Sequence, residues 1–132
     1  MAIDTNQAQV AVYNLLKTAN VCSGRVYDQP PEDDAKVTYP YVAIGDSDEQ
    51  ADDDSTGLGI DYSLTLDIWS EQPGKKEANT IRKAIGDALH LQTFTTGDGT
   101  DCLMWVDGGP TLQDPEGVGW HGIVRVRIQA RK

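Results

Sequence analysis

Cysteine, histidine and long apolar runs are all scarce in this chain of 132 residues. Cys22 and Cys102 lie far apart and show no metal-ligand spacing, so we expect two reduced thiols and no disulfide framework. His90 and His121 fall in different predicted elements, and neither has a second ligand at the spacing of a zinc site. No run approaches the ~20 apolar residues that cross a bilayer, and the first residues lack the pattern of a secretory signal. We therefore expect a soluble protein that is made in the cytoplasm and has no membrane partner.

Sequence motifs of catalysis and nucleotide binding are also missing. The chain contains no GxSxG, no Walker A motif and no GxGxxG. The TGDGTD segment at 96–101 shares only its glycine content with phosphate-binding loops, and tight hairpin turns share it too. Because no coherent set of nucleophile, base and metal ligands is present, we predict that the protein is not an enzyme and uses no cofactor.

Positive charge is scarce, and it is unevenly distributed. The chain has 11 Lys and Arg against 21 Asp and Glu, a formal net charge of −10. Residues 1–66 hold 12 acidic and 3 basic side chains, whereas residues 67–132 hold 9 and 8. An acidic first half repels phosphates, so we predict no specific binding to nucleic acid. The asymmetry suits head-to-tail contact between copies, although solubility alone explains much of it.

The most acidic segment is GDSDEQADDDSTGLG, residues 45–59. Six of its acids fall within nine positions: Asp46, Asp48, Glu49, Asp52, Asp53 and Asp54. It does not fit a calcium loop of EF-hand type, because the fifth position from Asp46 is Gln50 and the twelfth is Gly57. We expect a solvated, mobile loop at the tip of a long hairpin. A looser cation-binding site in this loop stays open as an alternative.

Hydrophobic periodicity predicts two helices, at 5–18 and 75–90. Predicted strands lie at 25–28, 39–45, 59–70, 102–108 and 120–130, with a short one at 92–96. The segments 30–38 and 111–119 are predicted loops, the second with a turn at 114–117. This order predicts an α+β fold in which a mostly antiparallel β-sheet packs two α-helices on one face. We expect a single domain over residues 1–132.

The strand at 59–70 alternates strictly, so its two faces differ. We predict that its apolar series, Ile60, Tyr62, Leu64, Leu66 and Ile68, faces the helices together with Ile81, Ile85 and Leu89. Trp69 interrupts the polar series on the other side, and Trp105 gives its own strand large apolar groups on both faces. Such aromatics are covered by the chain itself or by another subunit, and both readings stay open. In the last strand, Arg125 and Arg127 are predicted to point away from the core and to contact a neighbouring subunit or another partner protein.

Several stretches in order carry a resemblance to a known family. They are GRVYDQPP (24–31), YPYVAIGD (39–46), DYSLTLDIWSEQPGKKEANTIRKAIGDALH (61–90) and DPEGVGWHGIVRVRI (114–128). The most specific part is the strand ending at 68–70, followed by a short turn and a basic helix ending at 88–90. In this order and spacing the chain resembles the tail-completion proteins, or tail terminators, of long-tailed phages and gene transfer agents.

The resemblance implies a structural role without catalytic residues. Members form a ring, typically sixfold, on the head-proximal end of a finished tail tube, where they stop polymerisation and join the tail to the head. The implied partners are copies of the chain itself, the major tail tube protein and the head–neck connector protein, with DNA passing through the ring. Assembly would occur in the host cytoplasm, and the protein would end in the tail–neck region of the virion. A stopper on the head side of the neck is the alternative.

The candidate interface residues combine the acidic segment with the outward-facing aromatic and basic side chains. They are Asp46, Asp48, Glu49, Asp52, Asp53, Asp54, Trp69, Arg125 and Arg127. The acidic segment is expected to line the lumen of the ring or to meet a basic surface on the neck or tube.

Overall fold

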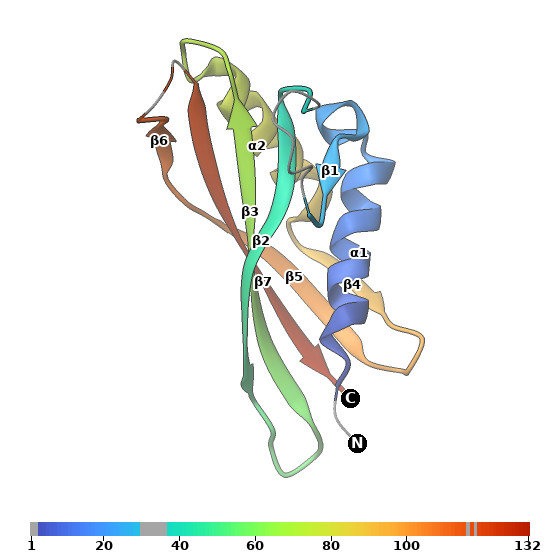
Figure 1. Ribbon diagram of the computed structural model, residues 1–132. Helices are drawn as coiled ribbons and strands as arrows, with labels where there is room; N and C mark the ends of the chain where they lie inside the picture. Colours follow the sequence, from blue (N-terminus) through green and yellow to red (C-terminus); the bar gives the residue numbers. More distant parts are fainter. Residues whose placement is uncertain (1–2, 30–36, 116, 118) are drawn as a thin grey trace.

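Two helices pack on one side of a curved, seven-stranded sheet (Figure 1). The computed structural model describes residues 3–29, 37–115, 117 and 119–132. The helices are α1 (Thr5–Thr18) and α2 (Lys76–Leu89), and a 3-10 turn covers Val21–Gly24. The strands are β1 (Val26–Tyr27), β2 (Tyr41–Ala51), β3 (Gly59–Ser70), β4 (Gln92–Thr95), β5 (Asp101–Gly108), β6 (Thr111–Gln113) and β7 (Trp120–Arg131).

The sheet has the strand order β1-β2-β3-β7-β5-β4, and β6 pairs separately with β7. All pairs are antiparallel except β1 with β2. The central pair, β3 with β7, runs without interruption from Gly59 opposite Arg131 to Ser70 opposite Trp120. The predicted α+β class, with a mostly antiparallel sheet and two helices, is confirmed.

Each helix is amphipathic and buries one stripe against the sheet. At the start of α1, the Asp4 carboxylate accepts the N–H of Asn6 at 3.0 Å, which satisfies one backbone donor that the first turn leaves free. The buried helix residues are Ala8, Val12 and Leu16 in α1, and Ala78, Ile81, Ile85 and Leu89 in α2. Across the described chain, neither helix has the length and apolar content that a bilayer crossing requires.

The core lies between the helices and the inner face of the sheet. On β3, Leu64, Leu66 and Ile68 are at most 1% exposed, and Tyr62 is also buried. Ile60, nearer the end of the strand, is partly buried against the same cluster. The prediction that this alternating series faces the helices is therefore confirmed.

Two segments differ from the predicted elements, and one cannot be compared. The acidic segment is strand as far as Ala51, and residues 111–113 form β6, where we predicted loops. β6 escapes periodicity analysis because it is only three residues long, and its pairing with β7 is what makes it a strand. The predicted turn is present, with the Gly117 N–H donating to the Asp114 carbonyl at 3.3 Å. Most of the predicted loop at 30–38 falls on residues 30–36, outside the described residues.

Candidate functional site

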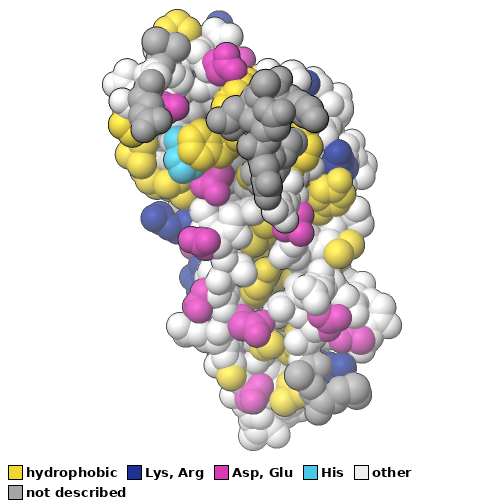
Figure 2. Space-filling model, in the orientation of Figure 1, with side chains coloured by type: hydrophobic (Ala, Val, Ile, Leu, Met, Phe, Trp, Pro, Cys, Tyr) yellow, Lys and Arg dark blue, Asp and Glu magenta, His cyan; other side chains and the backbone are white. Residues whose placement is uncertain are grey.

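The candidate surface is the outer face, defined as the side of the sheet turned away from both helices. Its side chains come from alternate positions of the strands, chiefly Asp61, Asp67 and Trp69 on β3, Trp105 on β5, and His121, Arg125, Arg127 and Arg131 on β7. Figure 2 shows acidic side chains spread over the surface in this view, with fewer basic ones. Of the nine candidate residues, Trp69, Arg125 and Arg127 lie on this face.

Arg127 is held by neighbours within its own chain. Its guanidinium donates to Asp61 Oδ2 at 2.9 Å, and its Nε lies 4.0 Å from Asp107 Oδ2. The guanidinium carbon also lies 5.1 Å from the centroid of the Trp105 ring, which is cation–π geometry. Trp105 thus supports a charged side chain of the neighbouring strand.

Arg125 differs from Arg127, although sequence analysis treated the two alike. Both point away from the core, as predicted, but Arg125 is exposed while Arg127 is half-buried. Within the described part of the chain, the side chain of Arg125 makes no hydrogen bond, ion pair or ring contact, although its backbone is part of the β7 ladder. Of the two arginines, Arg125 is the one whose charge is available to a partner.

Trp69 is fixed by a stack on the adjacent strand. Its ring lies parallel to that of His121, with centroids 3.9 Å apart and an interplanar angle of 7°. His121 Nε2 is in turn 2.8 Å from Asp67 Oδ1, which orients the imidazole. Trp69 remains only partly buried after this stacking. The chain itself therefore covers one ring face of Trp69 and leaves part of the side chain exposed.

The acidic segment is not the solvated loop that sequence analysis predicted. β2 continues through Asp46, Asp48 and Glu49, and a bulge between Ile44 and Ser47 interrupts its pairing with β3. Side chains on both faces of β2 are exposed over this stretch. The charges are solvated without leaving the ladder, and no alternation of polarity marks the strand. This is why the sequence pattern failed to show it.

Much of the acidic strand lies on an edge of the sheet. β1 pairs only with Val42 and Ala43, so beyond them β2 has no second strand neighbour among the described residues. Charged side chains along an unpaired strand oppose pairing with another chain. Asp46, Asp48 and Glu49 are thus suited to keeping this edge free.

The remaining acids close the tip of the hairpin. The Arg131 guanidinium lies 3.0 Å from Asp52 Oδ2 and 3.1 Å from Asp54 Oδ2. The Asp54 carboxylate also accepts hydrogen bonds from the hydroxyl and N–H of Thr56, and the Thr56 hydroxyl is the largest cause that lowers the Asp54 pKa. Asp53 accepts the N–H of Gly59 at 2.9 Å. The tip is therefore a hydrogen-bonded turn anchored to β7, and its mobility stays a prediction.

The titratable side chains of the described chain form no cluster with metal-binding geometry. Within the described ranges, no three His, Cys, Asp or Glu side chains are placed to hold a metal ion. Both cysteines are free, and burial raises the pKa of Cys22 and of Cys102 to about 11, which disfavours the reactive thiolate. His90 Nδ1 accepts the N–H of Val106 at 3.0 Å, so it joins the end of α2 to β5.

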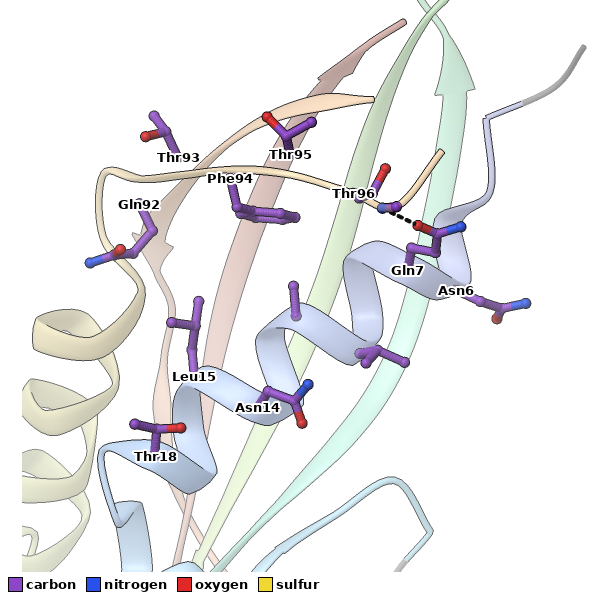
Figure 3. Close-up of a pocket in the computed structure, with 13 residues that line it drawn as sticks. Asn6, Gln7, Asn14, Leu15, Thr18, Gln92, Thr93, Phe94, Thr95 and Thr96 are labelled. Carbon is purple, nitrogen blue, oxygen red and sulfur yellow. Dashed lines mark hydrogen bonds between the residues drawn. The ribbon is translucent and has the colours of Figure 1, made fainter. Parts of the chain in front are cut away.

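A groove between α1 and the edge strand β4, the α1–β4 groove, was not foreseen. Its volume is about 530 Å³, and Val10, Leu15 and Phe94 line it without any charged side chain. In Figure 3, Leu15 and Phe94 point into it from opposite sides, and Gln7 closes one end by accepting the Gly97 N–H at 3.0 Å. The sequence feature that could have indicated this groove is Val10, an apolar residue outside the apolar stripe of α1. In the structure its side chain is 55% exposed.

Comparison with known proteins now adds to this geometry. The family model described as "Tail completion protein gp17" matches residues 8–130. Comparison with the curated proteins found no match. Among solved structures, a chain of the virion of a native gene transfer agent particle has a TM-score of 0.81 and 22% sequence identity, covering 97% of each chain. At this identity the likeness to the solved structure shows a shared fold.

Proposed function

Since this chain belongs to the tail completion protein gp17 family, we propose that it is a structural protein that caps the head-proximal end of a tail tube. In this proposal a single domain over residues 1–132 assembles into a sixfold ring. The ring stops tube polymerisation and joins the tail to the head. The observation that carries the proposal is the family match over residues 8–130, which includes most of α1, all of α2 and every described strand apart from the last residue of β7.

The surfaces of the chain support ring formation. A ring requires a heterologous contact, in which two different patches of each subunit meet. The chain offers unlike patches: a charged outer face, an acidic strand edge and an uncharged groove beside α1. The surroundings of the titratable groups also favour a structural role, since burial raises the pKa of both thiols to about 11 and His90 accepts a backbone N–H.

Within the ring, we assign two charged surfaces, Arg125 and the hairpin tip, to different surroundings. Arg125 faces a neighbouring subunit or the tube, because its charge has no partner among the described residues. The hairpin tip at 52–58 faces the lumen, with DNA passing through. Negative charge there repels DNA phosphates and lets the genome slide. In this arrangement the partners are the major tail tube protein and the head–neck connector.

The test is to let tail tube protein polymerise with and without this chain. We expect capped tubes of defined length that accept heads when the chain is present, and longer, unjoined tubes when it is absent. Arg125→Glu should reduce joining without changing the melting temperature, because no contact within the described residues is lost. Lys76→Glu, an exposed charge reversal on α2, is the matched control.

Two outcomes would overturn the proposal. Tubes that terminate normally without the chain would remove the capping role. Binding to the head-side assembly with no binding to tube ends would show a stopper of the neck instead.

A further inference from the structure

We propose that Leu112 of one copy inserts into the α1–β4 groove of the next copy and forms the subunit contact of the ring. This inference rests on the proposed function, because it names the surfaces that make the ring. It concerns a second copy of the same chain as the occupant of the groove.

The groove is an uncharged surface on an acidic protein. Its lining combines Val10, Ala11, Leu15 and Phe94 with amide and hydroxyl side chains, and no residue that lines it is charged. A charged occupant would lose its hydration there without gaining an ion-pair partner. The groove also borders β4, the last strand of the sheet, which has no neighbour on its far side among the described residues. It therefore fits a neutral, apolar group.

Leu112 is such a group, and hydrogen bonds hold the backbone of its strand. It is 49% exposed at the centre of β6, whose sequence, TLQ, is uncharged. Arg82 of α2 fixes the start of this strand by donating to the Pro110 carbonyl at 2.9 Å and to Thr111 Oγ1 at 2.8 Å. β6 also pairs with β7, where Leu112 lies opposite His121. Because the backbone of β6 is ordered before binding, little backbone entropy is lost when Leu112 binds.

The positions of groove and leucine favour a head-to-tail contact. Figure 1 places β6 and β4 on opposite sides of the molecule. The exposed large hydrophobic residues in the described chain are Val10, in the groove, Leu91, next to β4, and Leu112. A projecting side chain on one side of a subunit and a groove on the other allow a heterologous contact between copies. Such contacts close into a ring when the rotation from one copy to the next divides a full turn evenly.

Charge also favours this contact over others. Each copy carries a net charge of −10, so most pairs of surfaces that meet would bring like charges together. The groove and β6 are both free of charged side chains, so their contact avoids this repulsion at the point where the copies touch.

The test measures cross-linking rates between copies. A Leu112→Cys chain is mixed with a Val10→Cys chain, or with an Asn79→Cys chain as a control on the exposed side of α2, and a short bismaleimide is added. Rates are corrected for the reactivity of each thiol towards a monofunctional maleimide. The unchanged chain reports the background from Cys22 and Cys102. We expect the Leu112→Cys and Val10→Cys pair to link at least about tenfold faster than the control pair, because docking raises the local concentration of the two thiols.

Equal rates for the two pairs would overturn the contact. Faster linking of Leu112→Cys to itself would also overturn it, since that result indicates a twofold contact. The double variant Val10→Cys and Leu112→Cys should give a ladder of linked oligomers, and Leu112→Asp should abolish self-association while Leu112→Met preserves it. A chain that caps tubes but shows no preferred linking would refute this contact and leave the proposed function standing. Preferred linking by a chain that caps no tubes would support this contact and refute the proposed function.

Discussion

The two faces of the sheet use opposite means to fix the same strands. On the inner face of β3, Leu64 and Leu66 are stabilised by removal from water, a term that needs no specific partner. On the outer face, Asp61 and Asp67 each meet one side chain of β7, Arg127 and His121 respectively. Burial on the inner face therefore holds the sheet against the helices. The outer face adds specific side-chain pairs and leaves Arg125 available to a partner.

The largest effect is expected on the inner face. Leu66→Ala should lower the free energy of unfolding by about 2–5 kcal/mol, because it loses transfer free energy and leaves a cavity. Thr65→Ala, the next residue on the outer face, should change it by less than about 0.5 kcal/mol. Denaturant unfolding of both variants measures the difference. Similar losses for the two would show that the faces are not distinct in stability.

A smaller effect should separate the two arginines of the outer face. Arg127→Ala should cost about 1 kcal/mol, because it removes the bond to Asp61 and the contact with Trp105 from a partly exposed site. Arg125→Ala should cost close to nothing, since Arg125 has no partner among the described residues. Thermal unfolding of the two single variants compares them directly. An equal loss in both would contradict the difference in pairing.

The hairpin tip should show a weaker, salt-dependent effect. Arg131→Ala removes the ion pairs to Asp52 and Asp54, whose side chains are each close to half exposed, so the loss should be under about 1 kcal/mol. Salt at about 1 M should erase most of this loss, because screening shortens the range of charge interactions. Hydrogen exchange at the amide of Gly57 reports the local effect. Unchanged exchange in the variant at low salt would mean that Arg131 does not anchor the tip.

The smallest effect concerns the turn between β4 and β5. The hydroxyls of Thr96 and Thr100, followed by the charge of Lys132, lower the Asp98 pKa from 3.8 to about 2. Because the folded pKa lies below the unfolded one, the ionised group stabilises the fold above the unfolded value, and this stability is lost as pH falls towards 2. The melting temperature of Asp98→Asn should therefore be lower than that of the unchanged chain at about pH 5 and should converge with it near pH 2. A difference that stays constant over this range would exclude the linkage.

The sequence by itself determined those helices and strands whose hydrophobic periodicity lies within the segment itself. The helices predicted at 5–18 and 75–90, observed as Thr5–Thr18 and Lys76–Leu89, and the inner series of β3 follow from the apolar periodicity that each segment carries in its own sequence. The α+β class and the outward direction of Arg125 and Arg127 follow from the same patterns. The order and spacing of these segments also carried the family resemblance, which the match over residues 8–130 confirms.

Only the tertiary structure decided which groups meet. Arg127 and Asp61 are 66 positions apart, and their contact depends on the register of β3 against β7. Pairing with β3 likewise makes residues 46–51 part of β2, and pairing with β7 makes β6 a strand. Neither segment has a hydrophobic period, so the sequence pattern alone did not indicate a strand there. The α1–β4 groove likewise exists only where a helix and an edge strand from distant parts of the chain come together. Pairing between distant strands is a property of register and packing, and a local pattern of residues does not contain it.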